Sequence, residues 1–248
     1  MTTLHYNTAH TLEVDKENLR LQALNKYNIL DTPAEEEFDH IVTLASFICG
    51  TPISLISLIS DKRQWFKAKL GITEAETPRE LSFCQYAIQS DDILEIPDTL
   101  GDIRFYSNPF VTGNPNIRYY AGAPLVTNEG NRLGTLCVID TVPRELSEAQ
   151  KMALATLSEQ VVAHLELRLK KQEVEEEKQQ LKVVNQRLDE VMTFVNKQLP
   201  DSIRDLQKAA EQLSQDEENN NCLESESVRL VKNNISNLQN ILAKIQQG

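Results

Sequence analysis

The side chains best suited to chemistry are the thiols of four cysteines, Cys49, Cys84, Cys137 and Cys222, which lie far apart along the chain. Since no two of them form a C-x-x-C pair, their spacing argues against a disulfide scaffold and against a metal site such as zinc. Cys84, in the segment SFCQYAI, is the thiol placed best for redox chemistry. Core packing is the alternative, and it is what we expect of Cys49 and Cys137, since free cysteines are most often small apolar core residues.

A second group of candidate residues is polar and lies in the segment PDTLGDIRF. The group comprises Asp98, Asp102, Arg104 and Phe105. Turn residues surround this segment, and a loop held over a rigid sheet is where binding residues are most often found. The alternative is local structure, in which Asp98 caps a turn and Arg104 pairs with an acidic neighbour.

The elements that must position these residues follow from the periodicity of the apolar side chains. The predicted order is a helix at 15–30, a helix at 35–49, a hairpin at 51–70, a short helix at 81–89, a short strand at 92–98, a polar loop at 99–116, a hairpin at 117–140 and a helix at 146–167 capped by Ser147. Strands that pair mainly as hairpins form an antiparallel sheet, so the fold class is α+β with helices packed on the sheet. Tyr119 and Tyr120 alternate across that sheet, so only one of them can face a pocket, and Tyr120 is our candidate.

The composition changes near residue 170. Residues 1–170 hold seven of the eight glycines, eight of the nine prolines, the single Trp and all four His. Because these residues punctuate turns and fill globular cores, their loss indicates a change to long helices. We therefore expect a flexible N-terminus at 1–15, a globular domain at 16–170 and a helical segment at 171–248.

The helical segment carries two apolar seams at alternating steps of three and four residues. The first seam comprises Val174, Leu181, Val184, Leu188, Val191, Val195, Leu199, Ile203, Leu206, Ala210 and Leu213, and the second comprises Val228, Val231, Ile235, Leu238, Leu242 and Ile245. A polar break at 214–225 separates them, which predicts a coiled-coil hairpin. Two such hairpins bury both seams in a four-helix bundle, so we expect a homodimer. Pro200 and two successive steps of four after Val195 predict a local kink.

The globular part resembles the GAF domains that bacteria attach to histidine kinases and diguanylate cyclases. The resemblance is carried by LNKYNILDTPAEEEFD, RQWFKAKLG, ETPRELSFCQYAI, PDTLGDIRF, YYAGAPL and RLGTLCVID, in that order. It implies a sensory module whose ligand lies between the sheet and the segment with the middle helix and long loop. The ligand-binding candidates are then Cys84, Asp98, Asp102, Arg104, Phe105 and Tyr120.

The resemblance also offers particular chemistries for this domain. Chromophore-binding GAF domains attach a bilin to a cysteine beside a histidine, whereas Gln85 follows Cys84 here. GAF domains that reduce free methionine sulfoxide use several accessible cysteines, so a thiol reductase using Cys84 is an alternative function. The N-K-F-D-E pattern of cyclic-nucleotide GAF domains and a glycine-rich phosphate loop are both missing, which argues against a cyclic nucleotide ligand.

The helical segment resembles the dimerisation and phosphotransfer region of histidine kinases. In the stretch NKQLPDSI, at 196–203, Lys197 stands where the family has its phosphoacceptor histidine. A protonated lysine offers no lone pair for phosphotransfer, and no histidine follows His164. No glycine lies between Gly134 and Gly248, so the loops of an ATP-binding domain are missing too. The resemblance therefore implies a degenerate hairpin that keeps the shape without the chemistry.

The net charge of −12 restricts the partners. Both halves are acidic, and an acidic surface repels nucleic acid and anionic membranes. No stretch has the length of a membrane span or the form of an export signal, so we expect a cytoplasmic protein. These observations together predict a non-catalytic signalling protein that senses an unknown small molecule and contacts a histidine kinase or other signalling protein. A structural adaptor without ligand is a further alternative, and the sequence names no cofactor.

Overall fold

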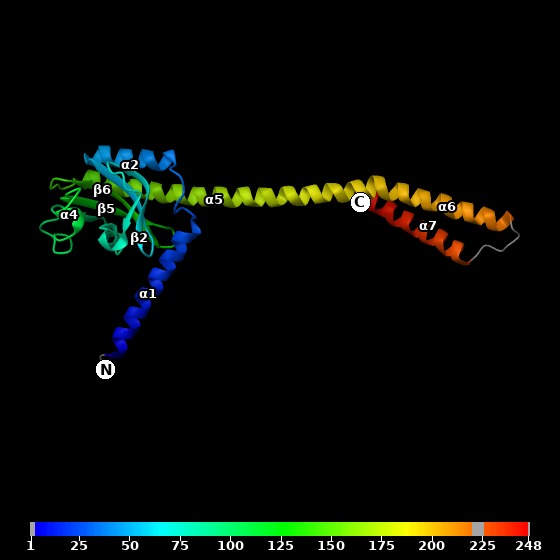
Figure 1. Cartoon of the computed structure of the whole chain (residues 1–248), viewed down its shortest axis with the longest axis horizontal. Helices are drawn as coiled ribbons and strands as arrows, with labels where there is room; N and C mark the ends of the chain where they lie inside the picture. Colours follow the sequence, from blue (N-terminus) through cyan, green and yellow to red (C-terminus); the bar gives the residue numbers. More distant parts are fainter. Residues whose placement is uncertain (1–2, 220–225, 248) are drawn as a thin grey trace. The chain divides into compact units, whose positions relative to one another are not determined.

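The computed structural model describes residues 3–219 and 226–247, and it describes side chains for 14–212 and 229–240. The chain divides into two compact units, Met1–Gln172 and Glu173–Gly248. Helix α5 (Glu148–Thr193) contributes residues to both units (Figure 1). Among the helices that the structure describes, none has the length and apolarity that crossing a membrane requires.

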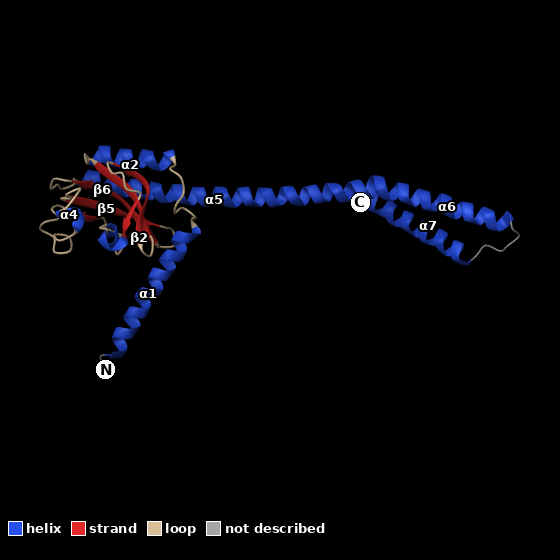
Figure 2. Cartoon of the chain, in the orientation of Figure 1, coloured by secondary structure: helices blue, strands red, loops and turns tan. Residues whose placement is uncertain are grey.

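The first unit is built on a six-stranded sheet in the order β3-β2-β1-β6-β5-β4, in which every neighbouring pair is antiparallel. Figure 2 shows the strands of this unit in red among its helices. The strands are β1 (Ile53–Ile59), β2 (Arg63–Leu70), β3 (Glu76–Pro78), β4 (Leu94–Ile96), β5 (Tyr119–Val126) and β6 (Arg132–Asp140). The two expected hairpins, β1–β2 and β5–β6, are confirmed, and so is the α+β class. Strand β3 was not expected, because its three residues are too few to show an alternating pattern.

The helices of the first unit lie on both sides of the sheet. They are α1 (Thr3–Lys26), α2 (Glu36–Cys49), the 3-10 turn η1 (Arg79–Leu81), α3 (Cys84–Ala87), α4 (Pro109–Thr112) and the start of α5. Helix α1 begins at Thr3 rather than at Asp15, so most of the segment expected to be a flexible N-terminus is helical here. No proline or glycine interrupts residues 3–26, and nothing local therefore ends the helix sooner. The hydroxyl of Ser147 accepts a hydrogen bond from the Gln150 N–H at 3.3 Å, as expected of an N-cap.

One face of the sheet packs against α1, α2 and α5. Its core includes Leu24 of α1, Phe38 of α2, Leu136 of β6 and Val161 of α5, all of them almost fully buried. A polar contact secures this layer. The ammonium group of Lys67 in β2 is buried and donates to the Glu35 carboxylate at 2.6 Å.

The opposite face of the sheet carries α3, α4 and the long loop before β5. Its core is rich in aromatic rings, and Phe83 stacks on Phe105 with 4.3 Å between ring centroids. Strand β1 supplies both cores, because Ile56 and Leu58 face one layer while Ile53 and Leu55 face the other. Its sequence ISLISLI is therefore buried throughout.

The second unit contains the end of α5, a π-helical turn at Phe194–Gln198, helix α6 (Leu199–Asn219) and helix α7 (Glu226–Gln247). Helices α6 and α7 pack through Ile203, Ala210 and Ile235. The π-turn ends two residues before Pro200, which has no backbone N–H to donate, so the helix is irregular where we expected a kink.

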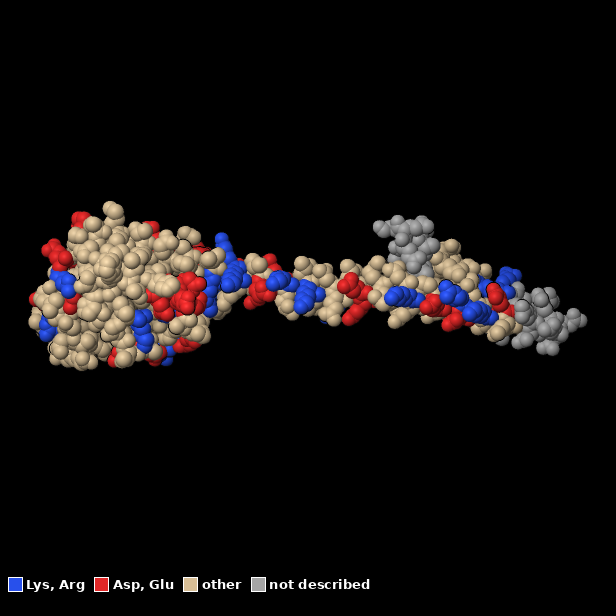
Figure 3. Space-filling view, turned by 90° about the horizontal axis from the view of Figure 1, so that it is seen from above, with Lys and Arg blue, Asp and Glu red and all other residues tan. Residues whose placement is uncertain are grey.

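Much of the expected apolar seam of α5 and α6 is exposed within the described part of the chain. Basic and acidic side chains are interspersed along these helices on the face seen in Figure 3. The side chains of Leu213, Val228, Leu242 and Ile245 lie outside the described residues, as does Cys222. The coiled-coil pairing, the homodimer and the likeness to a kinase hairpin stay predictions.

Candidate functional site

A cavity of about 430 Å³ lies between the sheet and the segment that carries α3 and α4. It is lined by Ile53, Leu55, Gln64, Phe66, Gly71, Ile72, Thr73, Glu74, Thr77, Ser82, Phe83, Cys84, Phe110, Asn114, Pro115, Ile117, Tyr120 and Ile139. This is the place where the sequence resemblance puts the ligand. A volume of this size and a mainly apolar wall with a few polar groups are typical of small-molecule sites.

Two polar atoms in the cavity wall have no partner. The Gln64 side chain is 6% exposed, and neither its carbonyl oxygen Oε1 nor the Thr77 hydroxyl Oγ1 has a hydrogen-bond partner among the described residues. The two residues face each other across β2 and β3. A buried polar atom without a partner costs about 1–3 kcal/mol, so this end of the cavity favours a molecule that donates hydrogen bonds.

Gln64 and Thr77 were not among our candidate residues. The alternation in RQWFKAKL places Gln64 on the same face as Phe66, and a polar residue among inward apolar ones was a signal that could have found it. Thr77 gave no such signal, because β3 is recognisable only from its pairing with β2.

The electrostatics of the cavity disfavour an anion. Glu74 lines it, while no lysine or arginine is found among the described residues that do. Hydrogen bonds from the backbone N–H groups of Glu74 and Thr73 lower the pKa of the Glu74 carboxyl, which keeps it ionised. The Lys69 ammonium donates to the backbone carbonyls of Thr73 and Glu74 and offsets part of this charge, but Lys69 does not itself line the cavity. A phosphate group in the cavity would therefore meet the Glu74 carboxylate without a cation in the described lining.

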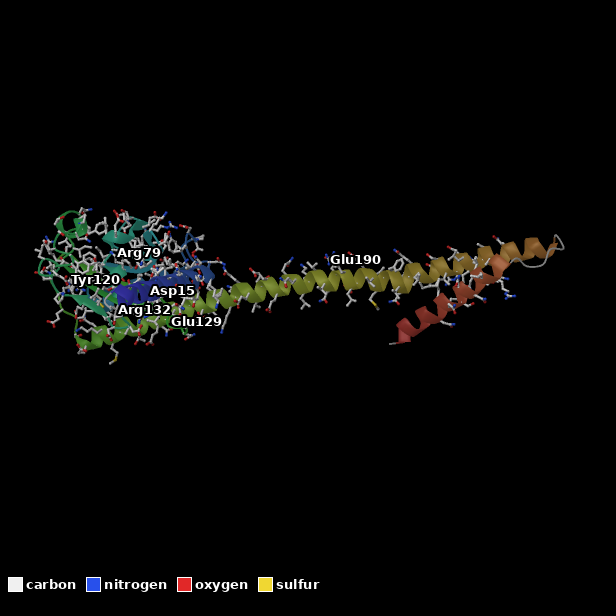
Figure 4. The ribbon with its side chains drawn as sticks, turned by 90° about the horizontal axis from the view of Figure 1, so that it is seen from below. Asp15, Arg79, Tyr120, Glu129, Arg132 and Glu190 are labelled. Atoms are coloured by element: carbon white, nitrogen blue, oxygen red, sulfur yellow. The ribbon has the colours of Figure 1, made fainter. Side chains whose placement is uncertain are left out.

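Cys84 and Tyr120, two of the expected site residues, meet at the cavity wall. The Tyr120 hydroxyl donates to the Cys84 sulfur at 3.3 Å, and both side chains are buried. Tyr120 lies inside the first unit, as labelled in Figure 4. Its ring packs tightly over its own strand, because a Cβ atom at Gly122 would lie 2.2 Å from the tyrosine oxygen. Burial and the neighbouring thiols raise the pKa of Tyr120 well above its usual value, so it stays a hydrogen-bond donor.

The remaining expected site residues lie away from the cavity. Asp102 and Arg104 form an ion pair at 2.6 Å on the loop, and Asp98 accepts the Leu100 N–H at 3.0 Å, as a turn cap would. Phe105 is fully buried behind Phe83. The structure thus brings Cys84 and Tyr120 together at the cavity, whereas Asp98, Asp102 and Arg104 form hydrogen bonds within their own loop. A role for any of them in binding a ligand stays a prediction.

Lys197, the expected counterpart of a phosphoacceptor, lies in the π-helical turn and is exposed. It belongs to the second unit, whereas the cavity is lined by residues of the first. Within the described residues, no three His, Cys, Asp or Glu side chains are grouped so that they could hold a metal ion.

A curated protein similar to this chain corrects our expectation about function. The chain is 42% identical over 152 residues to a cyclic di-GMP phosphodiesterase of Pseudomonas aeruginosa, a match that covers 61% of this chain and 26% of that protein. The chain thus spans about a quarter of its length. Our expectation of a non-catalytic signalling protein is wrong on this finding, because the similar protein is an enzyme of cyclic di-GMP turnover. The thiol-reductase and adaptor alternatives gain no support.

Solved structures with a similar first unit are distant in sequence. The GAF domain of an Acinetobacter phosphoenolpyruvate-protein phosphotransferase is 19% identical, with a TM-score of 0.46, 62% of this chain covered and 92% of that one. A domain of a two-component sensor histidine kinase protein of Sinorhizobium meliloti is 13% identical, with a TM-score of 0.45 and coverages of 57% and 97%. At these values, neither says anything about the ligand of this chain.

The family of the chain is identified by its match to a protein-family model. The model of the GAF domain matches residues 33–165, which is more than half of the chain and includes the whole sheet and α2 to α4. The same residues form the cavity and both of its walls. The chain belongs to the GAF domain family.

Proposed function

We propose that this chain is a regulatory sensor of cyclic di-GMP turnover, in which a ligand bound in the GAF cavity changes the activity of a cyclic di-GMP phosphodiesterase. The similarity to the Pseudomonas aeruginosa phosphodiesterase supports cyclic di-GMP turnover as the process that the chain regulates. The cavity supports a role in binding a small molecule. The observation that carries this proposal is that two buried polar atoms in the cavity wall, Gln64 Oε1 and Thr77 Oγ1, have no hydrogen-bond partner among the described residues.

The lining supports a particular class of ligand. Apolar side chains such as Leu55, Phe66 and Ile139 favour an apolar body, while Gln64 and Thr77 favour N–H or O–H donors at one end. The Glu74 carboxylate and the absence of lysine and arginine from the described lining disfavour a phosphorylated molecule. The ligand is therefore neutral or cationic, and it is distinct from the cyclic dinucleotide whose turnover it controls.

Binding is tested first on the chain alone. A library of small neutral and cationic molecules is screened by the shift in thermal unfolding temperature, and hits are measured by calorimetry. We expect Gln64→Leu to weaken a hit about 5- to 140-fold, because one hydrogen bond of about 1–3 kcal/mol is lost. Gln85→Leu is the matched control, since Gln85 is outside the cavity lining and bonds to the Glu80 carbonyl. Equal affinities in the two variants would contradict the proposed site.

Regulation is tested in a chimera. The similar segment of the Pseudomonas aeruginosa phosphodiesterase is replaced by this chain's GAF domain, and hydrolysis of cyclic di-GMP is measured with and without the hit. We expect the ligand to change the rate, and the Gln64→Leu chimera to need a correspondingly higher ligand concentration. A rate that stays constant at saturating ligand, in a chimera that still binds it, would refute the regulatory function.

A further inference from the structure

The thiols of Cys84 and Cys137 lie side by side in the wall of the cavity. Cys84 is the first residue of α3 and Cys137 is in the middle of β6, yet their sulfur atoms are only 3.9 Å apart. The two side chains are 2% and 0% exposed, respectively. Cys84 lines the cavity and Cys137 does not, so Cys84 is the one of these two cysteines that borders the space a molecule in the cavity would occupy.

We propose that Cys84 and Cys137 form an oxidation site, at which a small hydroperoxide that enters the cavity converts the two thiols into a disulfide. The inference rests on the contact of the two sulfurs and on the access to one of them. It does not depend on the ligand or on the regulation of a phosphodiesterase proposed above.

The reaction balances with a peroxide as the only oxidant. The Cys84 thiolate attacks one peroxide oxygen, the O–O bond breaks, and Cys84 becomes a sulfenic acid while the leaving oxygen takes up a proton as water or an alcohol. The Cys137 sulfur then attacks the Cys84 sulfur, the S–O bond breaks, and the hydroxyl leaves as water with the Cys137 proton. Two thiols are oxidised to one disulfide, and one peroxide is reduced.

The surroundings assign different roles to the two sulfurs. Burial raises the pKa of Cys84, but hydrogen bonds from Cys137, Ser57, Thr135 and Tyr120 outweigh it and lower that pKa below the usual value. The Cys84 contact and burial raise the pKa of Cys137 well above its usual value. Because Cys84 lines the cavity and Cys137 does not, Cys84 is the attacking thiolate, a role that its lowered pKa favours, and Cys137 resolves the sulfenic acid.

The geometry allows the bond with little movement. A disulfide needs the sulfurs to close from 3.9 Å to about 2.05 Å, which is roughly 0.9 Å for each atom. Helix α3 has only four residues, so a small shift of its first turn toward the sheet supplies the approach. The disulfide would then fasten α3, one wall of the cavity, to β6.

Cys49 is the natural control within the same unit. It is also buried, at 3% exposed, but it lies in the core on the other face of the sheet and does not line the cavity. Burial raises its pKa to about 11. Because the reactive thiolate fraction falls tenfold for each unit of pKa, Cys49 should react with peroxide at least about tenfold more slowly than Cys84.

The test uses the full chain with Cys222→Ser, which removes the fourth thiol and its cross-links. The protein is treated with one equivalent of hydrogen peroxide, quenched, denatured and alkylated, and its mass and peptides are measured. We expect a loss of two hydrogens, alkylation at Cys49 alone, and a dithiothreitol-sensitive peptide that joins Cys84 to Cys137. Full alkylation of Cys84 and Cys137, or oxidation of Cys49 as fast as Cys84, would overturn the proposal.

Single substitutions separate the two roles. With Cys137→Ser we expect a sulfenic acid at Cys84 that dimedone traps, and with Cys84→Ser we expect Cys137 to remain a thiol. A cooperative thermal unfolding transition shows that a variant is folded. Where a serine variant lacks this transition, the alanine variant at the same position is used instead. Dimedone labelling of Cys137 in the Cys84 variant would overturn the assignment of the attacking sulfur. No ligand or phosphodiesterase enters these assays, so the result stands apart from that of the proposed function.

Discussion

At the scale of single residues, an ion network joins α1 to the turn before α3. Arg20 is 6% exposed and donates to Glu17 at 2.8 Å, and Arg79, labelled in Figure 4, donates to the same carboxylate at 2.6 Å. Burial raises the pKa of Glu17, but the hydrogen bonds and charges of Arg20 and Arg79 outweigh it and lower the pKa to about 2. The folded state therefore binds the Glu17 proton more weakly than the unfolded state does.

This network predicts a dependence of stability on pH. Because the pKa of Glu17 falls from 4.5 to about 2 on folding, its contribution is present above pH 4.5 and is lost as the pH falls toward 2. We expect urea unfolding to show the largest difference between wild type and Glu17→Gln at neutral pH, with the difference shrinking below pH 4.5. Glu129→Gln, which removes an exposed pair with Lys26 at 3.6 Å, should change the unfolding free energy by less than about 1 kcal/mol. A Glu17→Gln effect of the same size at pH 3 and pH 7 would contradict this account.

At the scale of elements, Glu35 links three of them. It precedes α2, accepts from Lys67 of β2 at 2.6 Å and accepts from Arg168 of α5 at 3.1 Å. Lys67 also donates to the Pro33 carbonyl at 2.7 Å and to Thr32 at 3.0 Å. In the segment DTPAE, Thr32, Pro33 and Glu35 thus accept the hydrogen bonds of the buried Lys67 ammonium, which gives these residues a structural role.

We predict that Glu35→Gln lowers the free energy of unfolding by about 1.5–3 kcal/mol, the usual contribution of a hydrogen bond to a charged group. The neutral amide keeps the shape of Glu35 but leaves the charge of Lys67 poorly compensated. Chemical denaturation measures the change, with the exposed neighbour Glu37→Gln as control, whose effect should stay below about 1 kcal/mol. Equal effects of the two substitutions would mean that the linkage contributes nothing to stability.

At the scale of the whole molecule, the second unit leaves an apolar seam uncovered among its described residues. Leu181, Val184, Leu188 and Val191 of α5 are between 57% and 60% exposed. Their steps of three and four residues are those of a two-stranded seam, and each fully buried side chain of this kind contributes about 1.5–3 kcal/mol. A second copy of the chain would present the matching seam, which is what our prediction of a homodimer requires.

The homodimer predicts a clear effect of one substitution. We expect sedimentation equilibrium to show a dimer at micromolar concentration for the wild type and a large shift to monomer for Leu188→Asp, because a charge would be buried in the seam. Gln186→Asp is the matched control, since it introduces the same residue two positions away and off the seam. A monomeric wild type, or equal weakening by both substitutions, would show that this seam does not hold the dimer.

Much of the fold and part of the site could be inferred from local patterns. The alternation in RQWFKAKL predicted β2, the spacing of Phe38, Val42 and Ala45 predicted α2, and the loss of glycine and proline after residue 170 predicted the helical tail. These inferences succeed because periodicity is a property of neighbouring residues. The motif resemblance added the family and the place of the cavity.

Other features depend on contacts between residues that are distant in sequence. Cys84 and Cys137 are 53 positions apart, and only the packing of α3 on β6 makes them a pair. Gln64 meets Thr77 only because β3 adds to the edge of β2, and Lys67 is buried only because the chain before α2 folds over it. The sequence by itself determined most of the elements, although not β3 or the start of α1, and it indicated that they belong to a GAF domain. The tertiary structure decided which polar and thiol groups share a cavity, because burial and partnership arise only when separate elements pack together.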